Sequence, residues 1–417
     1  MNELSVRCQE NNKVKPTLLY EGYLRCTADP YHPTENTSGI INMGTSENTI
    51  CDDLVIPKLE SLTEITPPEL RYFCLNGMLP LREEVARFLT DKTKSDQQID
   101  PEELSITNGC SSAFCSLAYM IGEPGDYYLI PTPYYGMTKV YMGNYMQLKP
   151  IGVETDSNDM VSVRLLAEAW ERAVEEGKRV CGVVLINPSN PTGAIYSKEL
   201  QLEVFEFAKE RKLHVIIDEI YFLSTFEEDN LQSCLSFSRE WPDPARTHFM
   251  WGFSKDFSMS GSRSAVIHSK NKGVHQAFGK DIAFYHNVPG MVQMKLCRML
   301  RDVQWVDEYL RESRVRLMRH ADIVMTTLDQ LNLSYVKPTG TLYLWMDFTP
   351  LFRETPSPEE AAEIFYQMID SGIYIPSSKG FNGTDPAFFR LIYSIPEGFL
   401  TEAMARLRNF VIEYTAS

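Results

Sequence analysis

Short apolar runs that alternate with amphipathic stretches, between about residues 104 and 253, constrain the fold of this chain most strongly. The runs are YYLIP (127–131), CGVVLI (181–186), LHVII (213–217) and THFMWGF (247–253). The stretch at 198–210 has helical apolar periodicity, and Ser197 precedes it as a predicted N-cap. Strands that are almost continuously apolar and alternate with helices indicate an α/β fold with a mainly parallel sheet covered on both faces. Because ligands bind beyond the carboxyl ends of such strands, we expect functional side chains directly after each run.

The rest of the sequence predicts a second, smaller domain. A helix is expected at 81–90 and a long helical region at roughly 291–330, followed by strands within TLYLWMDF and FFRLIYS. The predicted division is an N-terminal arm with part of the small domain (1–65), a large domain (66–305) and a small α+β domain (306–417). The first 60 or so residues are rich in turn formers, and two placements stay open for them: against the small domain or against a partner subunit.

Charge and cysteine usage argue against several classes of function. The formal net charge of −16 disfavours nucleic acid or an anionic membrane as the main partner, because phosphates would be repelled. No apolar run reaches the roughly 18 residues that a membrane-spanning helix needs. The nine cysteines are scattered without a CxxC pair, so we expect neither a metal site nor a disulfide framework. The N-terminal sequence is polar and lacks the apolar core of a signal peptide, which makes a cytoplasmic protein our expectation.

Lys255, in the segment SKDFSMSGSR, carries the strongest chemical signal. Burying an ammonium group after an apolar strand is costly in free energy. Forming a Schiff base with an aldehyde removes that cost and gives the lysine a chemical task. Ser254 and Arg263 would supply a hydroxyl and a bidentate guanidinium to a phosphate on the same ligand. The alternative is a pair of surface cations at chance spacing.

Asp218 and Tyr221 lie in VIIDEIY, at the end of the apolar run LHVII. An acid in this place needs a cation, and a protonated pyridine nitrogen is a cation that makes its ring an electron sink. Tyr221 would donate a hydrogen bond to the phenolic oxygen of that ring. Asn190, in NPSNPTG, is held between prolines and would aim its amide at the same oxygen. An N-cap role for Asp218 and an ordinary turn at Asn190 are the alternatives.

Three further segments complete the candidate set. In NGCSSAF, the amides of Cys110 and Ser111 and the Ser111 hydroxyl would bind phosphate at a helix N-terminus, unless the serine only caps the helix. In PTPYYG, Tyr135 would stack on the cofactor ring, unless it belongs to the core. Arg390 lies within the apolar strand FFRLIYS, where it needs an anionic partner, either a substrate α-carboxylate or an internal Asp or Glu.

In this order, the motifs resemble those of the fold type I pyridoxal-phosphate aminotransferases across nearly the whole chain. The likeness is closest to the 1-aminocyclopropane-1-carboxylate synthase group, and within it to the animal synthase-like proteins. The matching segments are DPYHPTEN (29–36), GIINMGTSEN (39–48), IPTPYYG (130–136), PDPARTH (242–248) and SKDFSMSG (254–261). The resemblance implies pyridoxal 5′-phosphate as cofactor, a small amino acid as substrate, and a homodimer with active sites at the subunit boundary.

The resemblance also implies a role for each candidate residue. The catalytic residues would be Lys255, which shuttles the proton, Asp218 and Tyr221. The other cofactor contacts would be Asn190, Tyr135, Cys110, Ser111, Ser254 and Arg263. The substrate would be bound by Arg390, Ser46, Glu47 and Asn190.

Three positions depart from the plant synthases in this group. Leu75 stands where they have a tyrosine that reaches the cofactor of the other subunit, and a leucine has no hydroxyl to donate. Thr45-Ser46 replaces a Leu-Ala pair, although the following Glu47 is retained. Gly252 replaces a serine that often helps to bind phosphate. These changes leave the cofactor residues intact but argue against ring formation from S-adenosylmethionine.

The sequence therefore predicts an enzyme that acts on an α-amino acid through Lys255, with aminotransferase-like activity. One alternative is a 1-aminocyclopropane-1-carboxylate synthase or a carbon–sulfur lyase that eliminates a β- or γ-leaving group. The other is a binding protein that retains the cofactor without turnover. No second basic residue is assigned to a distal carboxylate, so the substrate side chain and the amino acceptor stay open.

Overall fold

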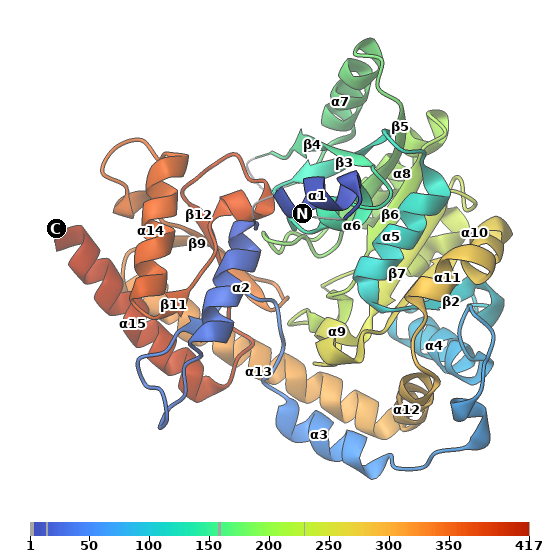
Figure 1. Ribbon diagram of the computed structural model, residues 1–417, viewed down its shortest axis with the longest axis horizontal. Helices are drawn as coiled ribbons and strands as arrows, with labels where there is room; N and C mark the ends of the chain where they lie inside the picture. The colour runs from blue at the N-terminus through green and yellow to red at the C-terminus, as the bar shows by residue number, and fades with distance from the viewer. Residues whose placement is uncertain (1–3, 14–15, 157–159, 229, 417) are drawn as a thin grey trace.

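A seven-stranded sheet organises the fold in the computed structural model (Figure 1), which describes residues 4–13, 16–156, 160–228 and 230–416. The strand order is β2-β8-β7-β6-β5-β3-β4, and β8 alone runs antiparallel to its two neighbours. The strands are β2 (Leu104–Thr107), β3 (Tyr127–Thr132), β4 (Lys149–Glu154), β5 (Val180–Ile186), β6 (His214–Asp218), β7 (Thr247–Gly252) and β8 (Ala265–Ser269). The prediction of a mainly parallel sheet is confirmed.

The four apolar runs of the sequence correspond to β3, β5, β6 and β7, each within one or two residues at either end. In the sheet register Ile186 pairs with Asp218, and Asp218 pairs with Met250. The carboxyl ends of these strands therefore lie side by side, and the segments that follow them emerge at one edge of the sheet.

Helices cover both faces of this sheet. Ile216 of β6 packs in one apolar cluster with Phe114. Its neighbours Val215 and Ile217 pack in another with Phe205, as the alternation of side chains along a strand requires. The helices near this sheet are α4 (Leu79–Lys92), α5 (Gly109–Ile121), α6 (Thr138–Gly143), α7 (Val163–Glu175), α8 (Lys198–Glu210), α9 (Phe253–Asp256), α10 (Lys272–Ala277), α11 (Ala283–His286) and α12 (Gly290–Arg301). The predicted cap of α8 is present, since the Ser197 hydroxyl accepts a hydrogen bond from the Leu200 amide.

The expected helical region at 291–330 is two helices rather than one. The backbone of Asp302 is not helical, and its side chain accepts a hydrogen bond from the Trp305 amide as the N-cap of α13 (Val303–Gln330). α12 packs on α4, whereas α13 extends away to α15 (Glu397–Ala416), as Figure 1 shows. The break at Asp302 lets the chain leave the large sheet and reach the C-terminal elements.

A three-stranded antiparallel sheet, in the order β12-β10-β9, forms the C-terminal part. Its strands are β9 (Ser334–Val336), β10 (Tyr343–Asp347) and β12 (Phe388–Ile392), and α14 (Pro358–Asp370) lies beside α15 (Figure 1). The two strands expected within TLYLWMDF and FFRLIYS are therefore present. In the register, Arg390 of β12 lies opposite Trp345 of β10.

The N-terminal segment contacts this C-terminal part. It contains α1 (Val6–Lys13), α2 (Leu18–Ala28), β1 (Ile41–Asn42) and α3 (Asp52–Ser61). β1 pairs in parallel with β11 (Ile373–Tyr374), and the Tyr374 hydroxyl donates to the Leu19 carbonyl at 2.9 Å. Of the two placements expected for the segment, the one against the small domain is present. The division of the chain at 65 and 305 stays a prediction. Among the described residues, no helix has both the length and the apolar character needed to cross a membrane.

Candidate functional site

Ten of the twelve side chains predicted from the sequence line one cavity at the carboxyl edge of the large sheet. They are Ser46, Cys110, Ser111, Tyr135, Asn190, Asp218, Tyr221, Ser254, Lys255 and Arg263. Asp218 is the last residue of β6, Lys255 lies on α9 directly after β7, and Asn190 follows β5. The sheet register described above is what brings these three together, although they are far apart in the sequence.

Arg390 and Glu47 lie beside the cavity rather than in its lining. Arg390 Nη1 donates to Asn190 Oδ1 at 2.8 Å, so the arginine is one hydrogen bond away from the cavity wall. Glu47 is exposed, and its Oε1 accepts from the Ser260 hydroxyl at 3.1 Å. Ser260 itself lines the cavity.

Lys255 is partly buried, and its Nζ donates a hydrogen bond to the Ser46 carbonyl oxygen. Desolvation and the positive charge of Arg390 together lower the pKa of Lys255 to about 8, and the negative charge of Glu47 opposes that shift. A lysine whose pKa is lowered in this way has a larger neutral fraction near pH 7, and the neutral amine is the nucleophilic form. The geometry excludes the alternative of a surface lysine.

Asp218 is 5% exposed, and within the described ranges its carboxylate accepts one hydrogen bond, at 3.1 Å from the Ile220 amide. Burial raises the pKa of Asp218 to about 7, and Lys255 only partly opposes that shift. Asp218 is not an N-cap, since the next helical turn begins after Tyr221. The carboxyl group thus lies in the cavity without a cation that holds it ionised, which is the environment that a protonated pyridine nitrogen would complete.

Tyr221 is the centre of a chain of hydrogen bonds at the cavity. Its hydroxyl lies 3.0 Å from the Ser46 hydroxyl and accepts from Asn190 Nδ2 at 3.3 Å. The Tyr221 ring also packs edge-on against Tyr343, with centroids 5.3 Å apart. Asn190 in turn accepts from Arg390, so four side chains from four separate segments form one polar network.

Arg390 is 1% exposed, and its Nε has no hydrogen-bond partner among the described residues. Its guanidinium lies over the rings of Phe381 and Tyr343, at 4.5 and 5.3 Å from their centroids. No Asp or Glu in the described part of the chain forms an ion pair with it. Of the two partners expected for Arg390, the internal carboxylate is therefore absent from these residues, and a buried donor stays available to a ligand.

The N-terminus of α5 and Arg263 form the other end of the cavity. Gly109 begins α5 with φ +79°, and a Cβ there would lie 2.5 Å from Arg263 Nη2, so glycine is required by both conformation and space. Arg263 Nη2 donates to the Ser111 hydroxyl at 3.0 Å. The first-turn amides of a helix have no partner within the helix, and together with a guanidinium they suit a phosphate. The N-cap is Asn108, so Ser111 is not the capping residue.

The structure also adds residues that the motifs did not single out. They are Phe114, Tyr141, Ile186, Ile220 and Ser260. Ser260 lies within the motif SKDFSMSGSR, so the sequence could have indicated it. Tyr141 lies on α6, and only the turn after PTPYYG brings it beside the predicted Tyr135, with ring centroids 6.4 Å apart. Burial raises the pKa of Tyr141.

Two of the departures from the plant synthases have a local structural explanation. A Cβ on Gly252 would lie 2.9 Å from the Ser264 carbonyl oxygen and 3.2 Å from Cys110 Sγ, so Cys110 fills the space of a larger side chain. Leu75 packs against an apolar cluster formed by Phe278, Ile282 and Ala283. Its replacement of a tyrosine is consistent with a packing role at this place.

Comparison with known proteins places the chain in a family. Residues 38–407 match the family described as "Aminotransferase class I and II". The "1-aminocyclopropane-1-carboxylate synthase-like protein 1" of Takifugu rubripes is 35% identical over 95% of this chain and 66% of that relative. The "Probable inactive 1-aminocyclopropane-1-carboxylate synthase-like protein 2" of Mus musculus is 36% identical over 95% of this chain and 70% of that relative. The chain thus spans about two thirds of the length of these relatives.

Solved structures agree on the fold. The aspartate aminotransferase from Thermus thermophilus with maleate superimposes with a TM-score of 0.81 over 98% of this chain and all of that one, at 21% identity. This likeness confirms the predicted fold type I architecture. The chain belongs to the aminotransferase class I and II family, and 1-aminocyclopropane-1-carboxylate synthase-like proteins are among its relatives.

Proposed function

We propose that the protein binds pyridoxal 5′-phosphate and acts on an α-amino acid with aminotransferase-like activity. The observation that carries this proposal is the buried Asp218 carboxyl, which forms no ion pair with a described residue and lies in the same cavity as the low-pKa amine of Lys255. A ring cation and an aldehyde on one ligand would satisfy both groups. The family and the fold support the same cofactor.

The other cavity residues fit the remaining parts of this cofactor. Arg263, Ser111, Ser254 and the first-turn amides of α5 would hold its phosphate. Asp218 would bind the ring nitrogen, and Tyr221 and Asn190 the ring oxygen. Tyr135 would lie against the ring face, and Lys255 Nζ would attach to the aldehyde carbon. Cys110 would contribute its backbone amide, because burial raises the pKa of its thiol well above the usual value and keeps it neutral.

Arg390 would bind the α-carboxylate of the substrate through its unpartnered Nε and the adjoining guanidinium edge. Ser46, Glu47 and Asn190 would line the substrate on the same side. When bound, the cofactor would accept the electron pair that remains after a proton leaves the substrate α-carbon. Lys255 Nζ would take that proton, since its pKa of about 8 suits a general base near neutral pH.

A panel of amino acids, with S-adenosylmethionine included, tests this proposal on the purified protein loaded with pyridoxal 5′-phosphate. Borohydride reduction followed by peptide mass spectrometry should place the cofactor on Lys255, and Lys255→Ala should not be labelled. Amino-group transfer would be supported if the absorbance of the bound cofactor is lost, one equivalent of keto acid forms and no free ammonia is released. Ammonia with a released thiol, or methylthioadenosine, would instead establish elimination or ring closure.

A non-catalytic binding protein is the second candidate, because one of the similar proteins is named probably inactive. In that case the cofactor would label Lys255, yet no amino acid in the panel would change its absorbance. A wild-type protein that takes up no cofactor would contradict both candidates.

We also propose a homodimer, since large apolar side chains are exposed on the described chain. Tyr72, Phe284 and Tyr285 are 107%, 67% and 83% exposed. Exposed aromatic groups of this size are typical of surfaces that a partner covers. Light scattering should give the mass of a dimer, and the double variant Phe284→Ser/Tyr285→Ser should lower it, whereas Ile412→Ser on α15 should not. A monomeric wild-type protein would contradict the proposed homodimer.

A further inference from the structure

The segment that follows Tyr221 is tied to the helix that carries Lys255 by one buried carboxylate. Asp256 directly follows Lys255 on α9 and is 1% exposed. Its Oδ1 accepts from the Ser224 hydroxyl at 2.6 Å, and its Oδ2 accepts from the Leu223 amide at 3.3 Å. Ser224 and Leu223 belong to the 3₁₀ turn η3 (Phe222–Ser224), which begins one residue after Tyr221.

A third hydrogen bond fixes Asp256 on the sheet side. Trp251 Nε1, from β7, donates to Asp256 Oδ2 at 2.8 Å. The carboxylate thus joins the strand before Lys255, the helix of Lys255 and the turn after Tyr221. All three partners donate to Asp256, whose two oxygen atoms accept these hydrogen bonds.

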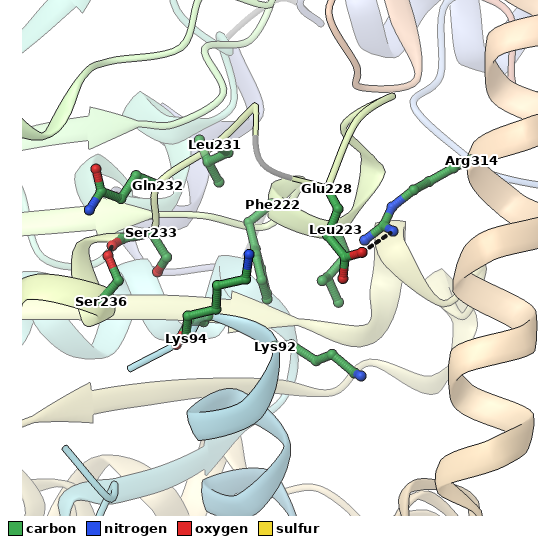
Figure 2. A pocket seen from close by; sticks show the side chains of 11 residues that line it. Lys92, Lys94, Phe222, Leu223, Glu228, Leu231, Gln232, Ser233, Ser236 and Arg314 are labelled. Atoms are coloured by element: carbon green, nitrogen blue, oxygen red, sulfur yellow. Dashed lines mark hydrogen bonds and ion pairs between the residues drawn. The ribbon is translucent and has the colours of Figure 1, made fainter. Parts of the chain in front are cut away.

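η3 is buried, since Phe222 and Leu223 are each 5% exposed and belong to the main apolar cluster. Figure 2 shows Phe222 and Leu223 at a cavity of about 360 Å³ whose wall also includes Arg314, Glu228 and Lys94. This cavity shares no lining residue with the candidate site. Packing and the hydrogen bonds to Asp256 therefore both position η3, and these hydrogen bonds join the Leu223 amide and the Ser224 hydroxyl to α9.

We infer that Asp256 is a positioning residue that sets the distance between the Tyr221 hydroxyl and Lys255. The inference rests on the proposed cofactor, whose ring oxygen Tyr221 would contact. The side chain does not touch the cavity and acts through the two turns that it joins. Its role is geometric: an asparagine can offer its oxygen to Trp251 and Leu223, and its amide to the Ser224 hydroxyl, which can turn to accept.

Four variants test the inference in the full-length protein. Asp256→Ala and Ser224→Ala break the link from its two ends, and Asp256→Asn keeps it. Ser238→Ala is the matched control. Ser238 is also buried, and its hydroxyl donates to Asp96 Oδ1 over 2.8 Å; neither residue lines the candidate site. The measurements are the affinity of the apoprotein for pyridoxal 5′-phosphate, the pH midpoint of the bound cofactor's absorbance, and the melting temperature of the apoprotein.

Loss of the link should move Tyr221 and weaken its hydrogen bond to the deprotonated cofactor. We expect the absorbance midpoint to rise in Ser224→Ala and Asp256→Ala, because a donor that stabilises the deprotonated form is lost. Cofactor affinity should fall by roughly fivefold, as for one hydrogen bond. Asp256→Asn and Ser238→Ala should keep the wild-type midpoint. Ser224→Ala carries the test if Asp256→Ala does not fold.

Two results would overturn the inference. Melting temperatures could fall in Ser224→Ala and Asp256→Ala while the midpoint stays at the wild-type value, which would make Asp256 a structural residue only. Asp256→Asn could shift the midpoint as much as Asp256→Ala does, which would make its charge the active property. If the wild-type protein takes up no cofactor, the proposed function fails instead, and that result is distinct from both.

Discussion

The lowered pKa of Lys255 makes a quantitative prediction about how the apoprotein captures its cofactor. The pKa is about 8 rather than 10.5, because the amine is desolvated and lies near Arg390. At pH 7 about one tenth of the amine is neutral, against roughly one part in 3,000 for an ordinary lysine. The neutral amine attacks an aldehyde, so capture should be about 300 times faster than that of an exposed lysine, from this cause alone.

The assay is stopped-flow absorbance of apoprotein mixed with pyridoxal 5′-phosphate between pH 6 and 10. The rate should rise with pH and level off above a midpoint near 8. Glu47→Gln should move the midpoint down, since Glu47 raises the pKa of Lys255, and Arg390→Gln should move it up. Lys255→Ala should show no capture. A wild-type midpoint near 10.5, or a shift of both variants in one direction, would refute the electrostatic reasoning.

Three other perturbations follow from the site. Burial raises the folded-state pKa of Asp218 from 3.8 to about 7, so the unfolded chain releases this proton first and stability falls as the pH rises from about 4 to about 7. Asp218→Asn should therefore raise the melting temperature of the apoprotein at pH 8 but not at pH 3.5, while cofactor affinity falls; equal effects at both pH values would contradict this. Arg390→Lys should raise KM for the amino acid about tenfold or more with little change in cofactor affinity, because a bidentate contact is lost; an unchanged KM would remove Arg390 from the substrate site. Gly252→Ser should cost about 1–3 kcal/mol of stability by thermal unfolding, since its Cβ would lie 2.9 Å from the Ser264 carbonyl oxygen, whereas Gly398→Ser has open space; equal losses would exclude the steric cause.

The sequence predicted the large sheet and most of the cavity because both depend on local signals. Asp218 stands out in the sequence because an acid at the end of an apolar strand is costly without a cation, and β6 does end at this residue. The strand ends then meet by the geometry of a parallel sheet. In this way residues from five separate segments were placed in one cavity without knowledge of any contact, although their chemical roles stay predictions.

Other features depend on contacts that no local pattern encodes. The break at Asp302 is not visible in the sequence, because the residues on both sides of it have helical periodicity. The link between Ser224 and Asp256 joins residues 32 apart, and each of them alone is an ordinary polar residue. Within the described residues no carboxylate forms an ion pair with Arg390, and this is a property of its surroundings, so the sequence left two partners open and only the fold distinguishes them.

The hydrogen bond between Arg390 and Asn190 spans 200 residues of sequence and joins β12 to the loop after β5. In the proposed function, a substrate carboxylate that reaches Arg390 Nη1 as well as the free Nε would exchange with Asn190 Oδ1, so the protein would compete with its own substrate. A carboxylate forms a charge-assisted bond, roughly twice as strong as the amide bond that it displaces, and the exchange is favourable. An amine without a carboxylate gains nothing from the exchange and leaves the internal bond in place. Discrimination against decarboxylated analogues would therefore be built into the resting protein, before any bond of the substrate is broken.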